Sequence, residues 1–369
     1  MVSAVILDGY VDEPTCLGVP PYISPYPRYI AGAIWSFDQT AKLQYYTIDQ
    51  IRHDHSILPN IGTTDFLIVI AGMAVPGRYL SGYPASPGEL SRFLTSIKNP
   101  LKLLCGPAAR YGFGLGGGKK TKHIDSNRDT FDASITGDPE LVIAEILEKG
   151  TIEEVDLNRK RKHAKDISSY AINGAKIIKQ HPYFPNRLIA EIETYRGCPR
   201  SIIGGCSFCS EPSKGPPDFR DQKDIHSEIK TLYKAGLQHI RIGDQPCIFS
   251  YKAHDAKTKA VPRPNPSEIE KLFSGIHTVA PDLKTIHVDN ANPGVIATYP
   301  DECEQIAETI VAYHTSGDVA AMGVESVDPI VIEENNLKAS ADDVYKAIIL
   351  LNKVGSKTVS YTHLRAHET

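Results

Sequence analysis

Residues 193–212 read Glu193-Thr-Tyr-Arg-Gly-Cys198-Pro-Arg-Ser-Ile-Ile-Gly-Gly-Cys206-Ser-Phe-Cys209-Ser-Glu-Pro212. This stretch contains three of the seven cysteines of the chain. The apolar alternation of residues 188–192 predicts a strand before it, and the apolar spacing of residues 221–234 predicts an amphipathic helix after it. The thiols therefore lie on a loop between a strand and a helix. Gly204-Gly205 lets the backbone of that loop fold tightly, so that the thiols can meet at one centre.

Three clustered thiolates are typical of a metal centre. They suit an iron–sulfur cluster with one iron left open, because a complete set of protein ligands would be four cysteines. A structural zinc site would also need a fourth ligand, for which Cys247 and His226 are candidates. A third interpretation is that the cysteines are buried and inert.

The stretch resembles the cluster loop of the radical S-adenosylmethionine (SAM) superfamily, in which three cysteines are separated by three and then two residues. Here the second interval matches, whereas the first is seven residues long (199–205), as in subfamilies with a longer loop. The flanking Tyr-Arg-Gly-Cys-Pro and Phe208 are also typical of the superfamily. More narrowly, most of the chain is similar to uncharacterised, mostly archaeal radical SAM proteins with a cobalamin-binding-like N-terminal domain.

The resemblance implies a set of cofactors and a reaction. Cys198, Cys206 and Cys209 would hold a 4Fe-4S cluster as its metal ligands, and the open iron would be chelated by S-adenosylmethionine. An external electron donor would reduce the cluster, and reductive cleavage of SAM would give a 5′-deoxyadenosyl radical that abstracts hydrogen from a small-molecule or macromolecular substrate. Arg196 and Arg200 are near enough in sequence to contribute to the site.

The composition is that of an ordinary globular protein. Among its 369 residues, 41% are hydrophobic and 23% are charged, and the net charge of -4 gives no general attraction to nucleic acid or to an anionic membrane. No apolar run is long enough to span a bilayer, and residues 1–10 do not resemble a signal peptide. The odd number of cysteines favours a reducing compartment. We therefore expect a cytoplasmic protein without a membrane partner.

Residues 1–150 alternate between strand-like and helix-like patterns, which predicts a Rossmann-like, flavodoxin-type α/β domain with a parallel sheet. Strands are expected at residues 2–7, 43–48, 66–71, 101–105 and 131–136, with helices at 29–37, 87–97 and 141–148. The domain resembles a cobalamin-binding domain, but the chain lacks the Asp-x-His-x-x-Gly motif that ligates cobalt. His53 and His55 lie outside that pattern and are interpreted as surface residues. Cobalamin remains an interpretation.

Residues 151–186 are predicted to be a linker. They contain the basic run Arg159-Lys-Arg-Lys162, which is interpreted as a solvated face balanced by nearby acidic residues. The run could also contact the phosphates of a nucleic acid, which nothing else in the chain supports.

Residues 187–358 repeat a strand-then-helix pattern, with four complete units and the beginning of a fifth. The pattern and the resemblance together predict an incomplete radical SAM (β/α)6 partial barrel. Strands are expected at residues 188–192, 238–242, 285–288 and 320–324, and helices at 221–234, 267–277, 301–314 and 340–354. Residues 359–369 resemble an artefactual tail, so the natural chain is expected to have been cut near Lys357, and His363 and His367 are not treated as ligands.

Polar residues follow the predicted strands of this region, where ligands of parallel α/β folds bind. By the resemblance, they would bind SAM or the substrate; by a structural interpretation, they are turn and helix-cap residues. Their coincidence at successive strand ends favours the functional interpretation. The cofactor-binding candidates are Gly243, Asp244, Asp289, Asn290, Glu325 and Ser326, with Asn292 close to them.

The sequence therefore favours a radical SAM enzyme of unknown substrate, and methyl transfer through cobalamin is the most specific version of this function. A different class is a non-catalytic zinc or iron–sulfur binding module that recognises RNA or protein. A third is a nucleotide-binding α/β protein with incidental cysteines. Metal content separates the three, because they require about four irons with sulfide, one zinc or no metal.

Overall fold

The structure is a computed structural model that describes residues 1–13, 15–72, 82–115, 119–122 and 130–355. The chain divides into two compact units. Unit 1 comprises Met1–Ala190 and Lys234–Leu237, and unit 2 comprises Glu191–Tyr233 and Gln238–Thr369. The predicted tail, residues 359–369, and the expected cut near Lys357 lie outside the described residues.

Unit 1 is built around a five-stranded sheet in the order β10-β7-β6-β1-β5. All of its strand pairs are parallel. Counted in chain order, this is the flavodoxin-like order 2-1-3-4-5. The flavodoxin-type sheet expected from the sequence is therefore confirmed. The strand order reverses between β1 and β6, whose last residues Asp8 and Ile70 pair directly.

The central strands of this sheet are buried because they are almost wholly apolar. In β6, residues 67–70 are at most 1% exposed, as expected for a parallel strand covered on both faces. Capping boxes start two of the unit's helices: Thr47 exchanges hydrogen bonds with Gln50 at α2, and Ser86 does so with Glu89 at α4. His53 and His55 are exposed, as predicted.

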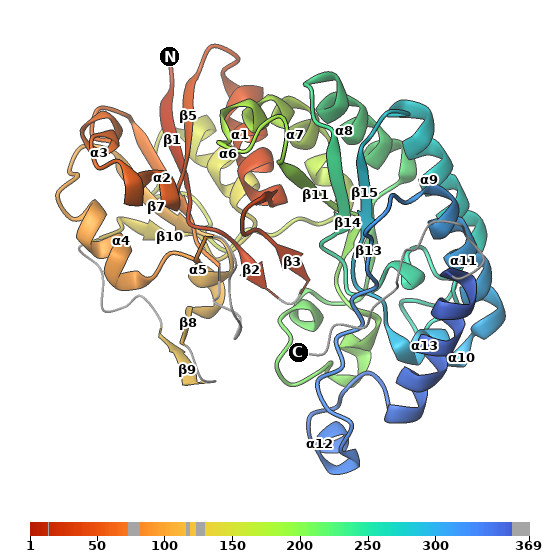
Figure 1. Ribbon diagram of the computed structural model, residues 1–369. Helices are drawn as coiled ribbons and strands as arrows, with labels where there is room; N and C mark the ends of the chain where they lie inside the picture. Colours follow the sequence, from red (N-terminus) through yellow and green to blue (C-terminus); the bar gives the residue numbers. More distant parts are fainter. Residues whose placement is uncertain (14, 73–81, 116–118, 123–129, 356–369) are drawn as a thin grey trace. The chain divides into compact units, whose positions relative to one another are not determined.

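Residues 151–186, the predicted linker, pack closely on α1 in unit 1. Gly32 of α1 lies against the carbonyl of Tyr170 in α7, and Gly174 lies against the carbonyl of Arg28. A side chain at either glycine would meet backbone, so the two glycines allow this close helix contact. Figure 1 shows α1 running beside α6 and α7.

The basic run in this segment is mostly exposed, as the sequence analysis expected, because Arg159, Lys160 and Lys162 face solvent. The side chain of Arg161 is the exception: it is 7% exposed and pairs with Glu140 of α6 at 2.6 Å, and the exposed Arg159 pairs with Glu145 of the same helix at 2.7 Å. Two of the four basic side chains thus fix the segment to α6. Their acidic partners lie in α6 and not among the acidic residues next to the run in sequence. The sequence analysis considered only those neighbouring residues.

The described elements of unit 1 are β1 (Ser3–Asp8), β2 (Asp12–Glu13), β3 (Cys16–Leu17), β4 (Tyr22–Ile23), α1 (Pro25–Phe37), β5 (Lys42–Thr47), α2 (Ile48–His53), α3 (Ile57–Ile61), β6 (Phe66–Ile70), α4 (Pro87–Leu94), β7 (Leu101–Cys105), α5 (Pro107–Tyr111), β8 (Phe113–Leu115), β9 (Lys119–Lys122), β10 (Ala133–Ser134), α6 (Pro139–Lys149) and α7 (Ser168–Asn173). Two 3₁₀ helices, Ala164–Ile167 and Ala175–Gln180, flank α7.

Unit 2 contains the sheet strands β11, β14 and β15, in the order β15-β14-β11. β14 and β15 are parallel, with Ile242 opposite Val288. The first two residues of β11 belong to unit 1, where they pair with β4. Helices α9, α11 and α13 pack against one another in sequence, and Figure 1 shows α11 and α13 side by side. This is the repeated strand-and-helix pattern that the sequence predicts.

The strand predicted at residues 320–324 is wrong. The segment runs beside the residues that follow β15, since Ala291 N donates to Ala321 O, but within it only Val324 forms a bridge. Gly323 has a φ of +53°, in the left-handed region. That conformation interrupts an extended backbone, so the ladder does not continue.

The described elements of unit 2 are β11 (Ile189–Glu193), β12 (Tyr195–Arg196), β13 (Asp218–Phe219), α8 (Gln222–Lys234), β14 (His239–Gly243), α9 (Pro266–Val279), β15 (Thr285–Val288), α10 (Pro293–Thr298), α11 (Pro300–Tyr313), α12 (Pro329–Glu334) and α13 (Ala341–Gly355). Among the residues described in either unit, no helix is both long and apolar enough to cross a bilayer.

Candidate metal centre

The three clustered cysteines lie on one closed loop, residues 197–215, which we call the cysteine loop. Its two ends meet, because Cys198 N donates to the carbonyl of Gly215 at 2.9 Å. Gly197 has a φ of +81°, and a Cβ there would lie 2.6–2.7 Å from the carbonyls of Pro216 and Gly215. Glycine is therefore required at the point where the loop closes.

A buried carboxylate braces the inside of this loop. Glu211 is 1% exposed, accepts a hydrogen bond from Gly197 N at 2.6 Å and pairs with Lys214 at 2.7 Å. The sequence analysis did not identify Glu211. Its position two residues after Cys209 gives no signal, because the contact that matters is with a residue 14 positions earlier.

The thiols of the cysteine loop are close enough to influence one another electrostatically. Cys198 is 9% exposed, and Cys206 and Cys209 are partly exposed. The Arg200 amide hydrogen-bonds to the thiol of Cys198 and the Glu211 amide to that of Cys209, and each of these two thiols also senses the charge of Cys206. Burial raises the pKa of Cys198 to about 12 and that of Cys209 to about 11, despite these amide hydrogen bonds.

The three thiols do not form a ready-made site for a single zinc ion. Zinc–sulfur bonds of about 2.3 Å bring tetrahedral ligands close together. Within the described part of the chain, Cys198, Cys206 and Cys209 are not among the groups whose ligand atoms all lie within 4.8 Å of one another. At least two of the three sulfurs are therefore more than 4.8 Å apart. An iron–sulfur cluster, by contrast, is held by thiolates that bind separate irons.

The two candidates for a fourth zinc ligand are engaged elsewhere. His226 Nε2 lies 2.9 Å from the carbonyl of Leu272, between α8 and α9. Cys247 is buried, and its sulfur accepts a hydrogen bond from Asn292 N at 3.2 Å. Neither side chain completes a tetrahedral set with the cysteine loop.

A hydrogen-bonded network connects the ends of the three sheet strands, and we call it the strand-end network. Its centre is Gln245, which is fully buried. The Gln245 amide donates to the carbonyls of Ile242 and Asp289 at 3.1 and 3.0 Å and accepts from the Thr194 hydroxyl at 3.1 Å. Asn290 Nδ2 donates to the carbonyl of Gln245 at 2.8 Å. The network fixes the backbone of the predicted cofactor edge.

The predicted residues Gly243 and Asp244 end β14 beside this network. Gly243 lies against the carboxylate of Glu191, a fully buried residue of β11, and any side chain at this position would collide with it. Asp244 is 6% exposed and adopts a φ of +51°, a conformation that costs free energy in residues other than glycine. Both residues are thus constrained by their surroundings.

Asp289 and Asn292 have structural partners. The Asp289 carboxylate pairs with Arg241 at 2.8 Å and accepts from Asn290 N at 3.0 Å. Asn292 caps α10, since its side chain accepts from Gly294 N at 3.0 Å. These contacts match the structural interpretation of the two residues.

Glu325 and Ser326 follow residues 320–324 and precede α12. Glu325 is exposed, whereas the Ser326 hydroxyl accepts from Asp328 N at 3.1 Å, at the start of α12. The structure adds a residue that the sequence analysis missed. A Cβ on Gly323 would lie 2.9 Å from the ammonium of Lys338 and 3.3 Å from the Glu325 carboxylate, so these opposite charges flank Gly323. Lys338 also acts electrostatically on Cys209.

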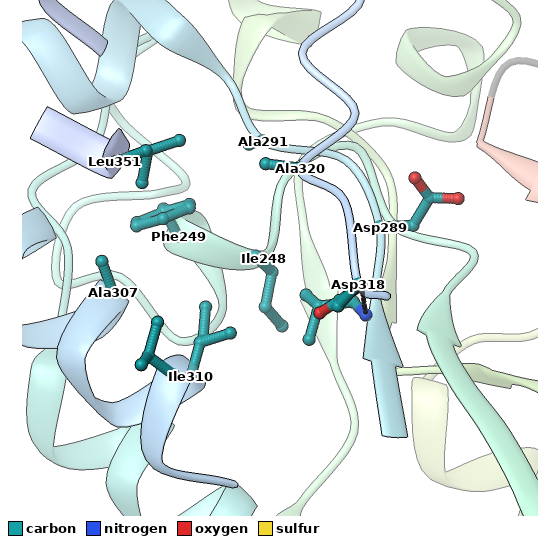
Figure 2. A pocket seen from close by; sticks show the side chains of 11 residues that line it. Ile248, Phe249, Asp289, Ala291, Ala307, Ile310, Asp318, Ala320 and Leu351 are labelled. Carbon is teal, nitrogen blue, oxygen red and sulfur yellow. Dashed lines mark hydrogen bonds between the residues drawn. The ribbon is translucent and has the colours of Figure 1, made fainter. Parts of the chain in front are cut away.

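An apolar cavity lies between the sheet of unit 2 and its helices (Figure 2). About 380 Å³ of space, part of it open to solvent, is lined mainly by aliphatic side chains and Phe249. Asp318 reaches its wall, but that carboxylate accepts from Val288 N and pairs with His314, each at 3.0 Å. Figure 2 shows the Asp289 carboxylate pointing away from the cavity. The cavity therefore presents little chemistry of its own.

Comparison with known proteins finds a superfamily match in the second half of the chain. Residues 192–367 match the profile of the Radical SAM superfamily. This part of the chain is therefore similar to proteins of the radical SAM superfamily. The match begins within β11 and includes the whole cysteine loop, as the resemblance in the sequence implies.

The sequence relatives are archaeal. The chain is 49% identical over 356 residues to an uncharacterised protein of Methanocaldococcus jannaschii, covering 96% of this chain and 64% of that protein. It is 40% identical over 361 residues to an uncharacterised protein of Archaeoglobus fulgidus, covering 96% of this chain and 61% of that protein. The chain thus spans somewhat less than two thirds of the length of these relatives.

One solved structure shares the fold over nearly the whole chain. The cobalamin-dependent S-adenosylmethionine radical enzyme OxsB, with aqua-cobalamin bound, aligns with a TM-score of 0.60 and 11% identity, covering 96% of this chain and 48% of OxsB. This likeness confirms the predicted fold class, a mixed α/β chain with parallel sheets and a fold similar to that of OxsB.

Proposed function

We propose that unit 2 is the catalytic module of a radical SAM enzyme that binds a 4Fe-4S cluster through Cys198, Cys206 and Cys209. The observation that carries this proposal is the cysteine loop itself. Its three thiols occupy one closed loop after β11, and three cysteines leave one iron of a 4Fe-4S cluster open. The superfamily match covers the same residues and supports the assignment.

When bound, the cluster would supply the electron that cleaves SAM to methionine and a 5′-deoxyadenosyl radical. The thiols must first lose their protons, which burial opposes and a bound iron favours. The amide hydrogen bonds to Cys198 and Cys209 stabilise the charged sulfurs. The loop, closed by Gly197 and Glu211, would hold these ligands in place while one iron stays open.

We propose that SAM lies along the neighbouring strand ends. Gly243 and Asp244 offer backbone carbonyls and a carboxylate, which suit an ammonium group. Lys338 and Glu325 flank Gly323 with opposite charges, which suit the carboxylate and the polar ribose of the same ligand. Asp289 and Asn290 would act mainly by fixing the backbone, because their side chains are already hydrogen-bonded.

Metal analysis tests the proposal. Anaerobic reconstitution with iron and sulfide should load about four irons and four sulfides per chain, and SAM should change the electron paramagnetic resonance spectrum of the reduced cluster. Zinc alone, in a ratio of one per chain, would instead favour a non-catalytic module that recognises RNA or protein. A cluster that does not respond to SAM would contradict the SAM site while leaving the cluster assignment intact.

For unit 1 we propose a cobalamin site at the carboxyl edge of its sheet. The supporting observation is the flavodoxin-like strand order, whose switch point lies between β1 and β6. OxsB, which shares the fold, has cobalamin bound. Because the chain lacks the Asp-x-His-x-x-Gly motif, cobalamin would bind without a histidine ligand from that motif. Titration with hydroxocobalamin, followed by its absorption spectrum, tests this; no spectral change and no retention after gel filtration would contradict it.

The partners of the whole protein follow from the same proposal. An external electron donor would reduce the cluster, and the substrate would be a small molecule or a macromolecule that binds near the strand ends. With cobalamin in unit 1, methyl transfer is the reaction type that this pair of cofactors suits. Incubation with SAM labelled in its methyl group, and a search for labelled cobalamin, would test that reaction.

A further inference from the structure

A distant turn holds the unusually long interval between the first two cysteines. Arg200, in the middle of that interval, is 8% exposed. Its Nη2 donates to the carbonyl of Asn336 at 2.6 Å, to the Asn336 side-chain oxygen at 3.0 Å and to the carbonyl of Leu337 at 3.2 Å. These partners follow α12 and lie 136–137 positions later in the chain.

The same turn returns hydrogen bonds to the loop. Asn336 Nδ2 donates to the carbonyl of Ile203 at 2.9 Å and to that of Gly205 at 2.7 Å. Ser207 N donates to the carbonyl of Asn335 at 3.1 Å, and the Ser207 hydroxyl bonds to its side chain at 2.8 Å. We call residues 335–337 the clasp. Asn336 adopts a φ of +47°, a left-handed conformation that asparagine tolerates better than most residues.

The loop also contains buried donors that point to a missing acceptor. Within the described residues, Arg200 Nε and the Ser201 hydroxyl are buried without a hydrogen-bond partner. Both lie just after Cys198, whose sulfur already accepts from the Arg200 amide. Buried N–H and O–H groups are usually satisfied, and cluster sulfurs accept hydrogen bonds. The interval is therefore suited to surround a sulfur-rich group.

We propose that the clasp and Arg200 position the cysteine loop for its cluster, a role that rests on the proposed function. A seven-residue interval has more conformational freedom than a short one, and ordering it only on cluster binding would weaken binding. The clasp holds the interval through five hydrogen bonds, and it holds Ser207, just after Cys206, through two more. Arg200 and Asn336 are thus positioning residues.

Two variants separate this role from general stability. Asn336→Gly removes the side-chain hydrogen bonds but keeps the left-handed backbone conformation, which glycine adopts without strain. Arg200→Met removes the donors and keeps most of the apolar length. Arg263→Met is the matched control. Arg263 is an arginine of unit 2 whose side chain is 62% exposed and pairs with Glu302, which is not part of the cysteine loop. Circular dichroism checks that each variant of the full chain folds, and Arg200→Lys replaces Arg200→Met if the latter does not.

The experiment uses two measurements. In the metal-free chain, hydrogen exchange of peptides spanning residues 199–207 should be faster in Asn336→Gly and Arg200→Met than in the wild type. In the reconstituted chain, iron release to a chelator should be roughly tenfold faster in each, as expected for the loss of one or two net hydrogen bonds. Arg263→Met should match the wild type in both measurements.

The outcomes are distinct. Unchanged exchange would show that the clasp does not hold the loop, and faster exchange with unchanged iron release would show that holding the loop does not position the cluster; either result overturns the inference. A wild-type chain that binds no cluster would instead overturn the proposed function and the positioning role with it. The hydrogen-exchange data would then still show whether the clasp holds the cysteine loop.

Discussion

The cysteine loop and the strand-end network lie next to each other in unit 2, but their polar groups are arranged in opposite ways. In the strand-end network, Gln245, Thr194 and Asn290 bond to one another and to neighbouring carbonyls. In the cysteine loop, Cys206 and Cys209 are partly exposed, and Cys198 and Cys209 receive hydrogen bonds from backbone amides.

The difference separates residues that build a site from residues that act in it. Side chains that satisfy one another stabilise a shape and have little capacity left for a ligand. Thiols supported only by the backbone keep their capacity to bind a metal. The contrast predicts that changes in the network should reduce stability first, whereas changes in the loop should reduce cofactor binding first.

The largest effect is expected from Cys206→Ala. Loss of one of three ligands should lower the iron content of the reconstituted chain from about four per chain to nearly none, because two thiolates do not hold a cluster. Colorimetric iron and sulfide assays measure this. Cys303→Ala is the control, because Cys303 is a buried cysteine of α11 whose thiol donates to the carbonyl of Val295 in α10. Full iron content in Cys206→Ala would contradict the assignment of the cysteine loop as the cluster site.

Gln245→Leu should act on stability instead. The leucine cannot replace the hydrogen bonds that the Gln245 side chain makes to the Thr194 hydroxyl and to two carbonyls. We therefore expect the free energy of unfolding to fall by about 4 kcal/mol. Urea titrations followed by circular dichroism give the value. Gln305→Leu, an exposed position on α11, should change it little. A similar loss in both variants would mean that the network does not stabilise unit 2 as described.

Asp8 extends the comparison to unit 1. Burial raises its pKa from 3.8 to about 6, although Tyr45 and the Tyr10 amide hydrogen-bond to it. Because the folded pKa is the higher one, the contribution of Asp8 to stability is complete below about pH 4 and is lost as the pH rises through 6. This amounts to about 3 kcal/mol. In Asp8→Asn, the fall in stability between about pH 3 and about pH 8 should become smaller by that amount; an unchanged pH profile would contradict the assignment.

The smallest effect is expected from Glu325→Gln. Glu325 is exposed, so stability should stay the same. If its carboxylate contacts SAM, the concentration of SAM needed to change the spectrum of the reduced cluster should rise roughly tenfold, the loss of one charged hydrogen bond. Glu308→Gln, on α11, provides a comparison at another acidic position. An unaltered SAM requirement in Glu325→Gln would assign this strand end to structure, like Asn292.

The sequence allowed the elements and the chemistry to be predicted, but not the contacts between distant segments. Apolar periodicity located the strands of both units, because burial on a sheet imposes it, and the cysteine spacing located the loop. The strand predicted at residues 320–324 does not form, because Gly323 adopts a left-handed conformation. That conformation depends on its neighbours in the fold, so the sequence did not reveal it. The clasp was not predictable either, since nothing in Asn335-Asn336 indicates a partner more than 130 positions earlier. Lys338 was missed for the same reason.

The production of 5′-deoxyadenosine tests the central claim most directly. The reconstituted wild-type chain, reduced anaerobically with SAM, should release 5′-deoxyadenosine and methionine in equal amounts, detected by mass spectrometry, and Cys206→Ala treated identically should release neither. A wild-type chain that carries about four irons but forms no 5′-deoxyadenosine would contradict the assignment of unit 2 as a radical SAM catalytic module.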